Sequence, residues 1–470
     1  MYLKKLHISN FRCFRDYTIE FAPGVTVLFG KNGSGKSTLI HAIHKALSFA
    51  FHRSKDSGAI NLGAGFSNLK PRDYGKSEDL VRDPNTGMPF PFIDIHATAQ
   101  FHNATLDWSM YASMSTFKPQ PSKYTEAFNK LSAEIQATDT LPLFAYFSDS
   151  FPHVSGNNTK LTETEMSLRN LGYLGWDEET AYSDLWITRL TKIWTLWDRA
   201  SRNVQHEESA LRNCDYFKAK GIVTEKEYNE DVALHTVRFE AAKREKECYD
   251  GEVNAIRKCL SEFSKGDPNL EVIDIFVSVY EESGLCLSTR DGRNPSFRQL
   301  PAGYKRILYM ALDIAYRSYI LSRGQSTNIP GVVIIDEIDL HLHPELEKVV
   351  LQRFMRTFTK AQFIVSTHSP LVLTGMSTAS RNNVILRMEV DSRTPTIWND
   401  IYGLDYNTGV QEVMGVDSGD EDLEWAISEC AFMLNHNLKE QEQKLREQIL
   451  EKGLITSEEL DRRINKQQSM

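Results

Sequence analysis

Four short runs of apolar residues stand out along the chain, because they lack the alternation of the segments around them. They cover residues 25–29, 141–147, 331–335 and 362–366. Continuous runs rich in Val, Ile and Phe are typical of strands that are covered on both faces of a parallel sheet. The pattern therefore predicts a parallel core sheet whose strands come from distant parts of the sequence.

Alternating apolar and polar residues mark a second group of strands. The alternation is found in the first residues of the chain and again from residue 92 to residue 111. It indicates strands with one face buried and one face in water. We therefore expect a β-rich first lobe.

Residues 165–265 are predicted to be mostly helical, with charged positions dominating from Arg199 onwards. Gly221 interrupts this segment, and Thr224 and Glu227 fit the capping box that opens a new helix. The segment predicts an antiparallel hairpin with its tip near Gly221 and arms of about 25 to 40 residues, or about 40 to 60 Å. Two roles stay open: a bundle that decorates the lobe, or an arm that docks another protein.

The first candidate site follows the run 25–29, where residues 30–38 fit the Walker A pattern G-x-x-x-x-G-K-[ST] and lead into a helix. Glycines let backbone N–H groups wrap a phosphate chain, and the helix N-terminus adds positive potential. Lys36 is expected to reach the β- and γ-phosphates, and the hydroxyl of Ser37 to hold Mg²⁺. The residues predicted to bind the nucleotide are Asn32, Gly33, Ser34, Gly35, Lys36, Ser37 and Thr38.

Two more candidate groups follow the later runs. Asp336, at the end of run 331–335, is placed as the Walker B acid that holds Mg²⁺ through water, and Glu337 as the group that orients or deprotonates the attacking water. His368 comes just after run 362–366, where open α/β sheets bind ligands, and is predicted to contact the γ-phosphate as a switch. The alternatives are two solvated acids and a structural histidine.

Together with four further segments, these motifs resemble the ABC-type ATPases of the SMC/RecF/OLD-like branch. Residues 6–14 are similar to the branch's opening strand with its NFR-x-F turn, and residues 340–344 to its LHP form of Walker B. Residues 367–370 match its THSP histidine switch, and residues 300–308 stand where it has the LS-x-G signature. The chain also looks similar to the PtuA ATPases of Septu and related retron systems and to the AriA ATPases of PARIS.

The resemblance implies the fold and a division of the chain. The fold is α/β, a P-loop NTPase head of the ABC type with a β-rich first lobe, a parallel core sheet and an inserted helical hairpin. Residues 1–160 would form the N-terminal lobe with Walker A, and residues 161–270 the helical insertion. Residues 271–400 would form the C-terminal lobe with the signature, Walker B and the switch histidine. Residues 401–470 would form an acidic and helical tail.

The resemblance also implies how ATP is held. Two heads would sandwich it between Walker A of one and Gly303 of the other, with Arg12 as a further contact. The chain departs from the family at Pro301, where a serine is usual. Proline offers neither a hydroxyl nor an N–H, which puts the hydrolysis rate in question more than nucleotide binding. Gln100 is a weak candidate for the Q-loop, and an outward strand residue is the alternative.

Composition narrows the classes of function. A net charge of −9 gives no global basic signature, so nucleic acid is not indicated as a partner, although a local basic patch is compatible with it. The sequence has no run of about 18 apolar residues, so no membrane span is predicted. Six scattered cysteines show no disulfide or zinc spacing, which favours a reduced cytoplasm.

The leading expectation is an ATP- and Mg²⁺-dependent ATPase subunit of a bacterial antiphage defence or DNA-surveillance complex. By resemblance it would form a homo-oligomer and control a separately encoded nuclease or toxin, with a phage-derived trigger. No Toprim or HNH motif follows His368, which is why the effector is expected on another chain. The runner-up is a RecF-like clamp that uses ATP to dimerise on DNA, and a third option is an independent nuclease.

Overall fold

In the computed structural model the chain forms two compact units, Met1–Tyr402 and Gly403–Met470. The division of the first 400 residues into two lobes and an insertion stays a prediction. The structure describes residues 1–56, 58–74, 79–82, 87–113, 115–151, 163–176, 183–278, 284–378, 382–389, 392–398, 402–403, 421–436, 438–451 and 455–468.

An antiparallel sheet opens the first unit. Its strands lie in the order β2-β1-β4-β5, with β6 paired to β4. Alternate residues of β4 are buried, which confirms the predicted one-sided strands. The indole of Trp108 on β5 donates to the carbonyl of Ala46 at 2.8 Å, and so joins this sheet to the helix that follows Walker A. The strands are β1 (Tyr2–Phe11), β2 (Phe14–Glu20), β4 (Phe92–Phe101), β5 (Ala104–Ser109) and β6 (Ala112–Ser113).

The second sheet is the core of the unit, in the order β13-β12-β3-β11-β10-β7. All four predicted apolar runs are strands of it, and every residue of these four strands is buried. They pair in parallel, so their carboxyl ends share one edge. The strands are β3 (Val25–Phe29), β7 (Leu143–Phe147), β10 (Gly331–Ile335), β11 (Ala361–Ser366), β12 (Asn383–Arg387) and β13 (Thr396–Trp398). The expected α/β head with a parallel core sheet is confirmed.

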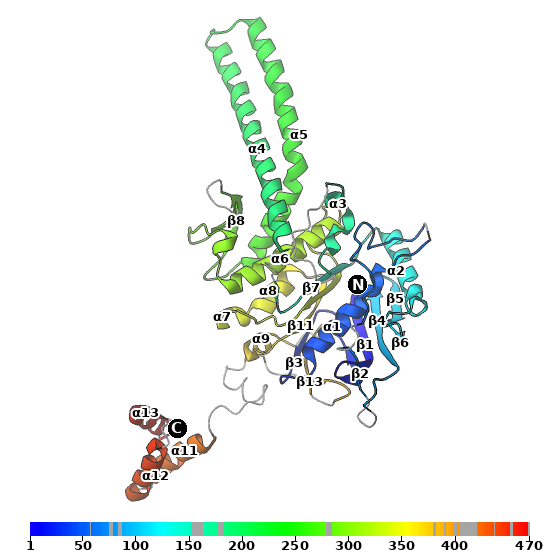
Figure 1. Ribbon diagram of the computed structural model, residues 1–470. Coiled ribbons are helices and arrows are strands. Elements are labelled where there is room, and N and C mark those ends of the chain that lie inside the picture. Colours follow the sequence, from blue (N-terminus) through cyan, green and yellow to red (C-terminus); the bar gives the residue numbers. More distant parts are fainter. Residues whose placement is uncertain are drawn as a thin grey trace. The chain divides into compact units, whose positions relative to one another are not determined.

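Helices surround this sheet and link it to the hairpin (Figure 1). α6 contacts both β7 and α5, and α8 also contacts α5. A small antiparallel pair, β8 (Val272–Val277) and β9 (Leu285–Thr289), follows the hairpin. The helices are α1 (Lys36–Leu47), α2 (Thr125–Thr138), α3 (Glu163–Ser167), α6 (Ala302–Leu321), α7 (Pro344–Glu347), α8 (Val350–Thr357) and α9 (Pro370–Thr374), with short 3-10 helices at Ser48–Phe51, Pro121–Lys123, Arg169–Tyr173 and Phe297–Gln299.

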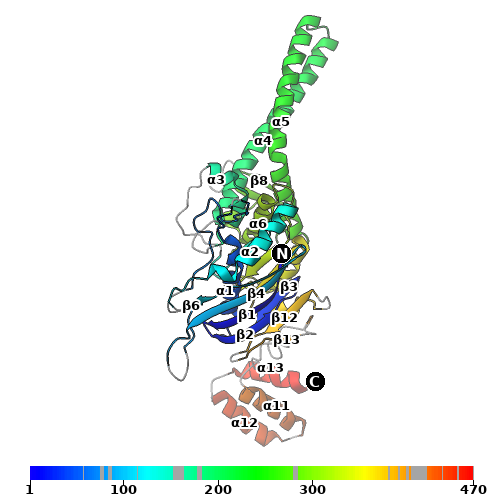
Figure 2. The ribbon, with the colours of Figure 1, turned by 90° about the vertical axis from the view of Figure 1, so that its right-hand side faces the viewer.

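The predicted hairpin is confirmed as α4 (Ser183–Ala219) and α5 (Glu225–Ser264), of 37 and 40 residues. Figures 1 and 2 show the two helices side by side along their length, extending away from the core sheet. Gly221 turns the chain with φ of 67°, and Thr224 forms the expected capping box with Glu227. The hairpin is therefore one continuous antiparallel pair.

In its described residues, the second unit holds three helices around a core of its own. They are α11 (Glu421–Asn435), α12 (Lys439–Glu451) and α13 (Ser457–Gln468), which confirms a helical tail. Ile427, Cys430, Leu460 and Ile464 lie in its buried centre. Residues 404–420 of the predicted acidic tail lie outside the described residues. Within the described parts of both units, no helix has the length and apolarity needed to cross a membrane.

Candidate functional site

The predicted site residues gather at the carboxyl edge of the core sheet. β3 and β10 flank β11 in parallel register, so the loops after these three strands are neighbours. β7 pairs with β10 on its other side and brings Ser148 and Asp149 to the same edge. Open α/β sheets bind ligands at this edge. The sequence had predicted the groups separately, and the sheet order brings them together.

Walker A forms a tight loop that ends on α1. Gly35 caps this helix with φ of 93°, and a Cβ there would lie 2.7 Å from the ring of Phe14 and 2.9 Å from Cys13 Sγ. Lys36 is 6% exposed, and its Nζ donates to the carbonyls of Gly30 at 2.9 Å and Lys31 at 3.2 Å. Burial lowers the pKa of Lys36, and the acids at 336, 337 and 339 partly offset this. The ammonium therefore lies within the loop, facing the carboxylates of Walker B.

The Walker A loop has hydrogen-bond donors without partners, which suit a phosphate group. Ser34 is 4% exposed, and in the described part of the chain its hydroxyl has no hydrogen-bond partner. No side chain caps the N-terminus of α1, whose first N–H groups face the loop. Asn32 and Gly33 are exposed at its tip. Buried donors without partners are costly, so an anion held here satisfies them.

The two residues predicted to hold Mg²⁺ lie together. The hydroxyl of Ser37, at the start of α1, is hydrogen-bonded to the carboxylate of Asp336 at the end of β10. Ser366 also donates to Asp336. Burial raises the pKa of Asp336 despite these two bonds. A hydroxyl and a carboxylate beside a phosphate loop are a suitable donor set for Mg²⁺.

Glu337 follows with a strained backbone. Its φ is 50°, a region that residues with a side chain seldom adopt, and its N–H donates to Ser366 Oγ at 2.8 Å. Burial raises the pKa of Glu337, the neighbouring Asp336 raises it further, and His368 lowers it. Strain of this kind is concentrated at functional sites. His368 is thus close enough to Glu337 to affect its charge.

The loop after β11 that carries His368, the histidine loop, is anchored by Asp339. The sequence analysis missed this residue. Thr367 Oγ1 donates to Asp339 Oδ1 at 2.5 Å, and the N–H of His368 donates to the same oxygen at 3.2 Å. Asp339 lies three residues after Walker B, on the turn that leaves β10. The carboxylate of Asp339 therefore fixes the histidine loop to the turn that follows β10. The signal in the sequence was an additional acid after the DE pair.

Arg306 on α6 is the second residue that was missed. It is 1% exposed, and Nη1 donates to the carbonyls of Asp149 at 2.8 Å and Phe151 at 2.9 Å. Nη2 donates to the carbonyls of Asp336 at 3.1 Å and Glu337 at 3.2 Å. Burial lowers the pKa of Arg306, and the acids nearby offset part of this. Arg306 thus links the signature helix to the ends of β7 and β10.

The remaining predicted residues lie around this centre. Arg12 has φ of 50°, and its Nε donates to buried Asp79 at 2.9 Å, so its guanidinium is held on the α1 side of the loop. Gly303 is buried in the first turn of α6, where a Cβ would lie 2.6 Å from the carbonyl of His341. Pro301 is exposed and precedes α6 as its N-cap, so it is not part of the first turn. The roles of Arg12 and Gly303 stay predictions.

A cavity of about 490 Å³ opens beside the loop. Its lining includes Gly33 and Ser34 of the loop. Two arginines, Arg15 and Arg393, and two acids, Asp16 and Glu389, also line it. The carbonyl of Arg393 accepts from the N–H of Thr18 at 2.9 Å, which ties this wall to β2. The cavity therefore continues the phosphate loop into a polar space whose lining has two basic and two acidic residues.

Gln100 lies on β4, away from these loops. Its side chain accepts from Lys4 Nζ at 2.9 Å and Thr105 Oγ1 at 3.0 Å, within the antiparallel sheet. These contacts agree with the outward strand residue that was the alternative. Among the described residues, no three His, Cys, Asp or Glu side chains gather as a metal site would require.

Two family models match parts of this chain. Residues 5–165 match a family model described as an AAA domain, and residues 256–374 match one described as an AAA domain, putative AbiEii toxin, Type IV TA system. Each model covers less than half of the chain.

Relatives of this chain include a retron ATPase, a Septu protein and a DNA replication and repair protein. A retron Ec83 probable ATPase from Escherichia coli is 23% identical over 389 residues, covering 78% of this chain and 68% of that protein. Septu protein PtuA from Bacillus mycoides is 40% identical over 77 residues, 16% of this chain and 11% of that protein. The DNA replication and repair protein RecF from Acetivibrio thermocellus is 38% identical over 71 residues, 15% and 19% of the two chains. The predicted resemblance to this branch of ATPases is confirmed.

Proposed function

We propose that this protein binds and hydrolyses ATP as the ATPase subunit of a bacterial antiphage defence complex. The observation that carries the proposal is the convergence of Lys36, Asp336, Glu337 and His368 at one edge of the core sheet. The retron and Septu relatives support the defence setting. Six cysteines without a disulfide support a reducing compartment, the cytoplasm.

Each group has a defined part in the reaction. Lys36 and the loop N–H groups bind the β- and γ-phosphates, and Ser37 and Asp336 would hold Mg²⁺, which neutralises charge on the phosphates when bound. Glu337 orients the attacking water and accepts its proton. His368 stands beside Glu337 and contacts the γ-phosphate side. The cavity lined by Arg15 and Arg393 takes the rest of the nucleotide.

Two copies would complete the site. The start of α6 is exposed at Pro301 and Ala302, and no side chain caps it. Its first N–H groups are therefore suited to an anion held by a second head. In such an oligomer, ATP binding closes the heads and hydrolysis opens them, which gives control over a separately encoded nuclease or toxin.

The direct test is ATP turnover by the full chain as its concentration is raised. We expect Lys36→Ala to abolish nucleotide binding, and Glu337→Gln to bind ATP normally while trapping the closed oligomer. Glu345→Gln is the matched control, since it makes the same change on an exposed glutamate of α7. Turnover by Glu337→Gln equal to the parent's would refute the role of Glu337. Unchanged ATP affinity in Lys36→Ala would refute the nucleotide loop.

The partner needs a separate experiment. Purification of the chain from its native cells with ATP and Mg²⁺, followed by mass spectrometry, should recover a stoichiometric nuclease or toxin on a multimer of this chain. A strictly monomeric protein under these conditions would contradict the sandwich.

One observation favours the RecF-like clamp as the second candidate. From Gly403 to Met470 the chain has 15 acidic residues and 7 basic ones, a net charge of −8 out of −9 in total. The first unit is therefore close to neutral, and the net charge of the whole chain says little against DNA binding by the head. Salt-dependent affinity for duplex DNA that requires ATP would move the assignment to the clamp.

A further inference from the structure

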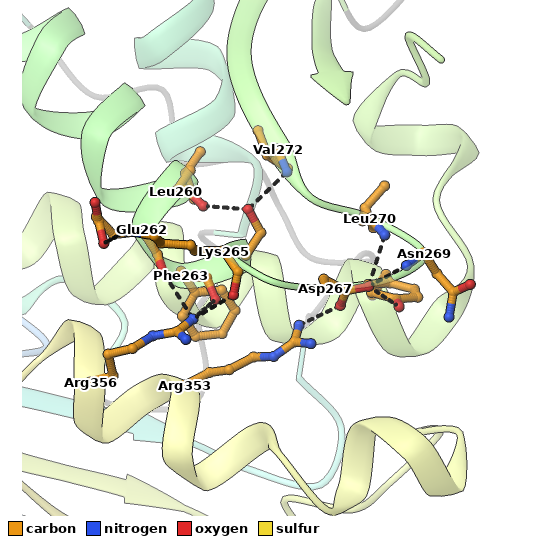
Figure 3. A network of polar contacts seen from close by, with 12 residues as sticks. Leu260, Glu262, Phe263, Lys265, Asp267, Asn269, Leu270, Val272, Arg353 and Arg356 are labelled. Atoms are coloured by element: carbon orange, nitrogen blue, oxygen red, sulfur yellow. Dashed lines mark hydrogen bonds and ion pairs between the residues drawn. The ribbon is translucent and has the colours of Figure 1, made fainter. Parts of the chain in front are cut away.

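A buried carboxylate joins the base of the hairpin to the signature helix. Asp267 lies in the turn between α5 and β8. Figure 3 shows Asn269 and Leu270 of this turn and Arg353 of α8 around it. It accepts the N–H groups of Asn269 at 2.7 Å and Leu270 at 2.8 Å. Arg353 on α8 forms an ion pair with it at 2.5 Å, and the hydroxyl of Tyr304 on α6 donates to it at 2.9 Å. The turn, α8 and α6 thus share one acceptor.

The cluster is closed to water. The side chain of Asp267 is 0% exposed, and that of Arg353 is 8% exposed. Burial acts to raise the pKa of Asp267, but the Asn269 N–H and the Arg353 guanidinium bring it below its usual value. Burial and Asp267 raise the pKa of Tyr304 to about 12. At neutral pH the carboxylate is charged and the tyrosine hydroxyl is its donor.

The end of the hairpin is fixed to the same helix α8. Arg356 Nη2 donates to the carbonyls of Glu262 at 3.0 Å and Lys265 at 3.1 Å, which are at the C-terminus of α5 (Figure 3). The ring of Phe354 packs on Phe263 of α5 with a centroid distance of 5.0 Å. The same ring lies 5.8 Å from that of Phe363 on β11. A shift of the hairpin base therefore acts on α8 and on the core strand that carries the histidine loop.

Tyr304 stands in the first turn of α6. It is two residues after exposed Ala302 and two residues before Arg306, whose guanidinium holds the Walker B carbonyls. The N-cap residue of this helix makes no side-chain bond to it. The position of the first turn of α6 therefore depends on the contacts of its own side chains. Tyr304 supplies one of them, a hydrogen bond to the ionised Asp267.

We propose that Asp267 and Tyr304 are positioning residues that hold the start of α6 where it can face the nucleotide of a second head. Because these two residues join α6 to the hairpin base, the nucleotide-dependent pairing of two heads becomes sensitive to the position of that base. This inference rests on the proposed ATP sandwich. It adds the residues that connect the hairpin to that interface.

The test compares two tyrosines of one helix. Tyr304→Phe removes the hydroxyl bonded to Asp267. Tyr309→Phe is the matched control, because its hydroxyl donates to Asp184 on α4 at 3.3 Å, five residues further along α6. Both changes are made in the full chain carrying Glu337→Gln, and ATP-dependent self-association is measured by sedimentation velocity. ATP affinity is measured at a protein concentration low enough to keep the chain monomeric.

We expect Tyr304→Phe to weaken self-association about 10-fold, the factor that corresponds to the loss of one hydrogen bond to an ionised group. Its ATP affinity should stay within about threefold of the parent's, since Tyr304 does not contact the nucleotide loop. Tyr309→Phe should change neither quantity. Hydrogen exchange of the amides at 302–306 should be faster in Tyr304→Phe alone. Asp267→Asn combined with Tyr304→Phe should add little to the single tyrosine change.

Three outcomes are separable. Pairing lost in Tyr304→Phe but kept in Tyr309→Phe supports the inference. Pairing kept in Tyr304→Phe, or lost equally in both, overturns it while the ATP sandwich stands. If the parent chain does not pair with ATP at all, the sandwich itself fails, and the positioning role falls with it. Should Asp267→Asn not fold, the two tyrosine variants still decide the matter.

Discussion

Replacing Arg306 by methionine tests whether helix α6 positions Glu337, the proposed water-activating group. Methionine keeps most of the length and the apolar stem but removes all donors. The guanidinium donates five hydrogen bonds to carbonyl oxygens, at 2.8 to 3.4 Å, and one acceptor is the carbonyl of Glu337. Each such bond contributes about 1.5 to 3 kcal/mol, and burying the charge costs several kcal/mol in return. The net loss of local stability should be about 3 kcal/mol.

That loss is comparable with the strain at Glu337. A residue held at φ of 50° costs about 1 to 3 kcal/mol. Among the described residues, Arg306, Ser366 and the N–H of Leu340 bond the main chain of Glu337. Without Arg306 the backbone can relax and carry the carboxylate away from the attacking water. Since 1.4 kcal/mol corresponds to a factor of ten, we expect kcat to fall about 10- to 100-fold. ATP affinity should change by less than about threefold, because Arg306 makes no bond to the Walker A loop.

The assay is steady-state turnover at saturating ATP and Mg²⁺, with ATP affinity measured separately by a fluorescent analogue. Arg317→Met is the control, because Arg317 is equally buried on α6 but bonds Asp313 and the carbonyl of Gly172. It should lower thermal stability while leaving kcat per folded molecule near that of the parent. An Arg306→Met variant with kcat within about threefold of the parent would refute the reasoning. So would an equal fall in Arg317→Met.

Three further predictions concern single groups. Gly35→Ala should abolish ATP binding in a fluorescence titration, since a Cβ would lie 2.7 Å from the Phe14 ring at φ of 93°; normal affinity would show that the loop adapts. Thr224→Ala should cost about 1 kcal/mol at the start of α5 and speed hydrogen exchange of its first turn about fivefold, with turnover unchanged; unaltered exchange would contradict the capping box. Because burial and Asp336 raise the pKa of Glu337, and the base must be ionised, turnover should fall with decreasing pH at values above the ordinary 4.5; a rate that stays flat down to that pH would argue against Glu337 as the base.

The elements of the site could be predicted locally. The strand at 25–29, the loop after it and the helix that follows are set by short-range signals: β-branched residues, glycines and a helix-forming segment. The hairpin could be predicted in the same way, because Gly221 and the capping box at Thr224 are short-range signals. Both predictions depended on neighbours within a few residues, which is why no tertiary contact was needed.

Arg306 and Asp267 could not be predicted in this way. Arg306 donates to main-chain carbonyls about 30 and 155 residues away. Every residue has such a carbonyl, so the sequence does not show which of them will accept a hydrogen bond. Asp267 finds its partners on α6 and α8, 37 residues or more along the chain. A charged residue in an apolar stretch signals burial, but its partner is decided by which elements pack together.

By itself, then, the sequence predicted the glycine-rich loop, the pair of acids after β10, the histidine after β11 and the length of the hairpin, because each depends on local residue chemistry. Only the tertiary structure decided the strand order that brings these loops to one edge and the contacts of α6 with Walker B and the hairpin base. Strand pairing and the burial of Arg306 and Asp267 are settled by long-range packing, since a buried charge is stable only where the whole fold supplies its partners.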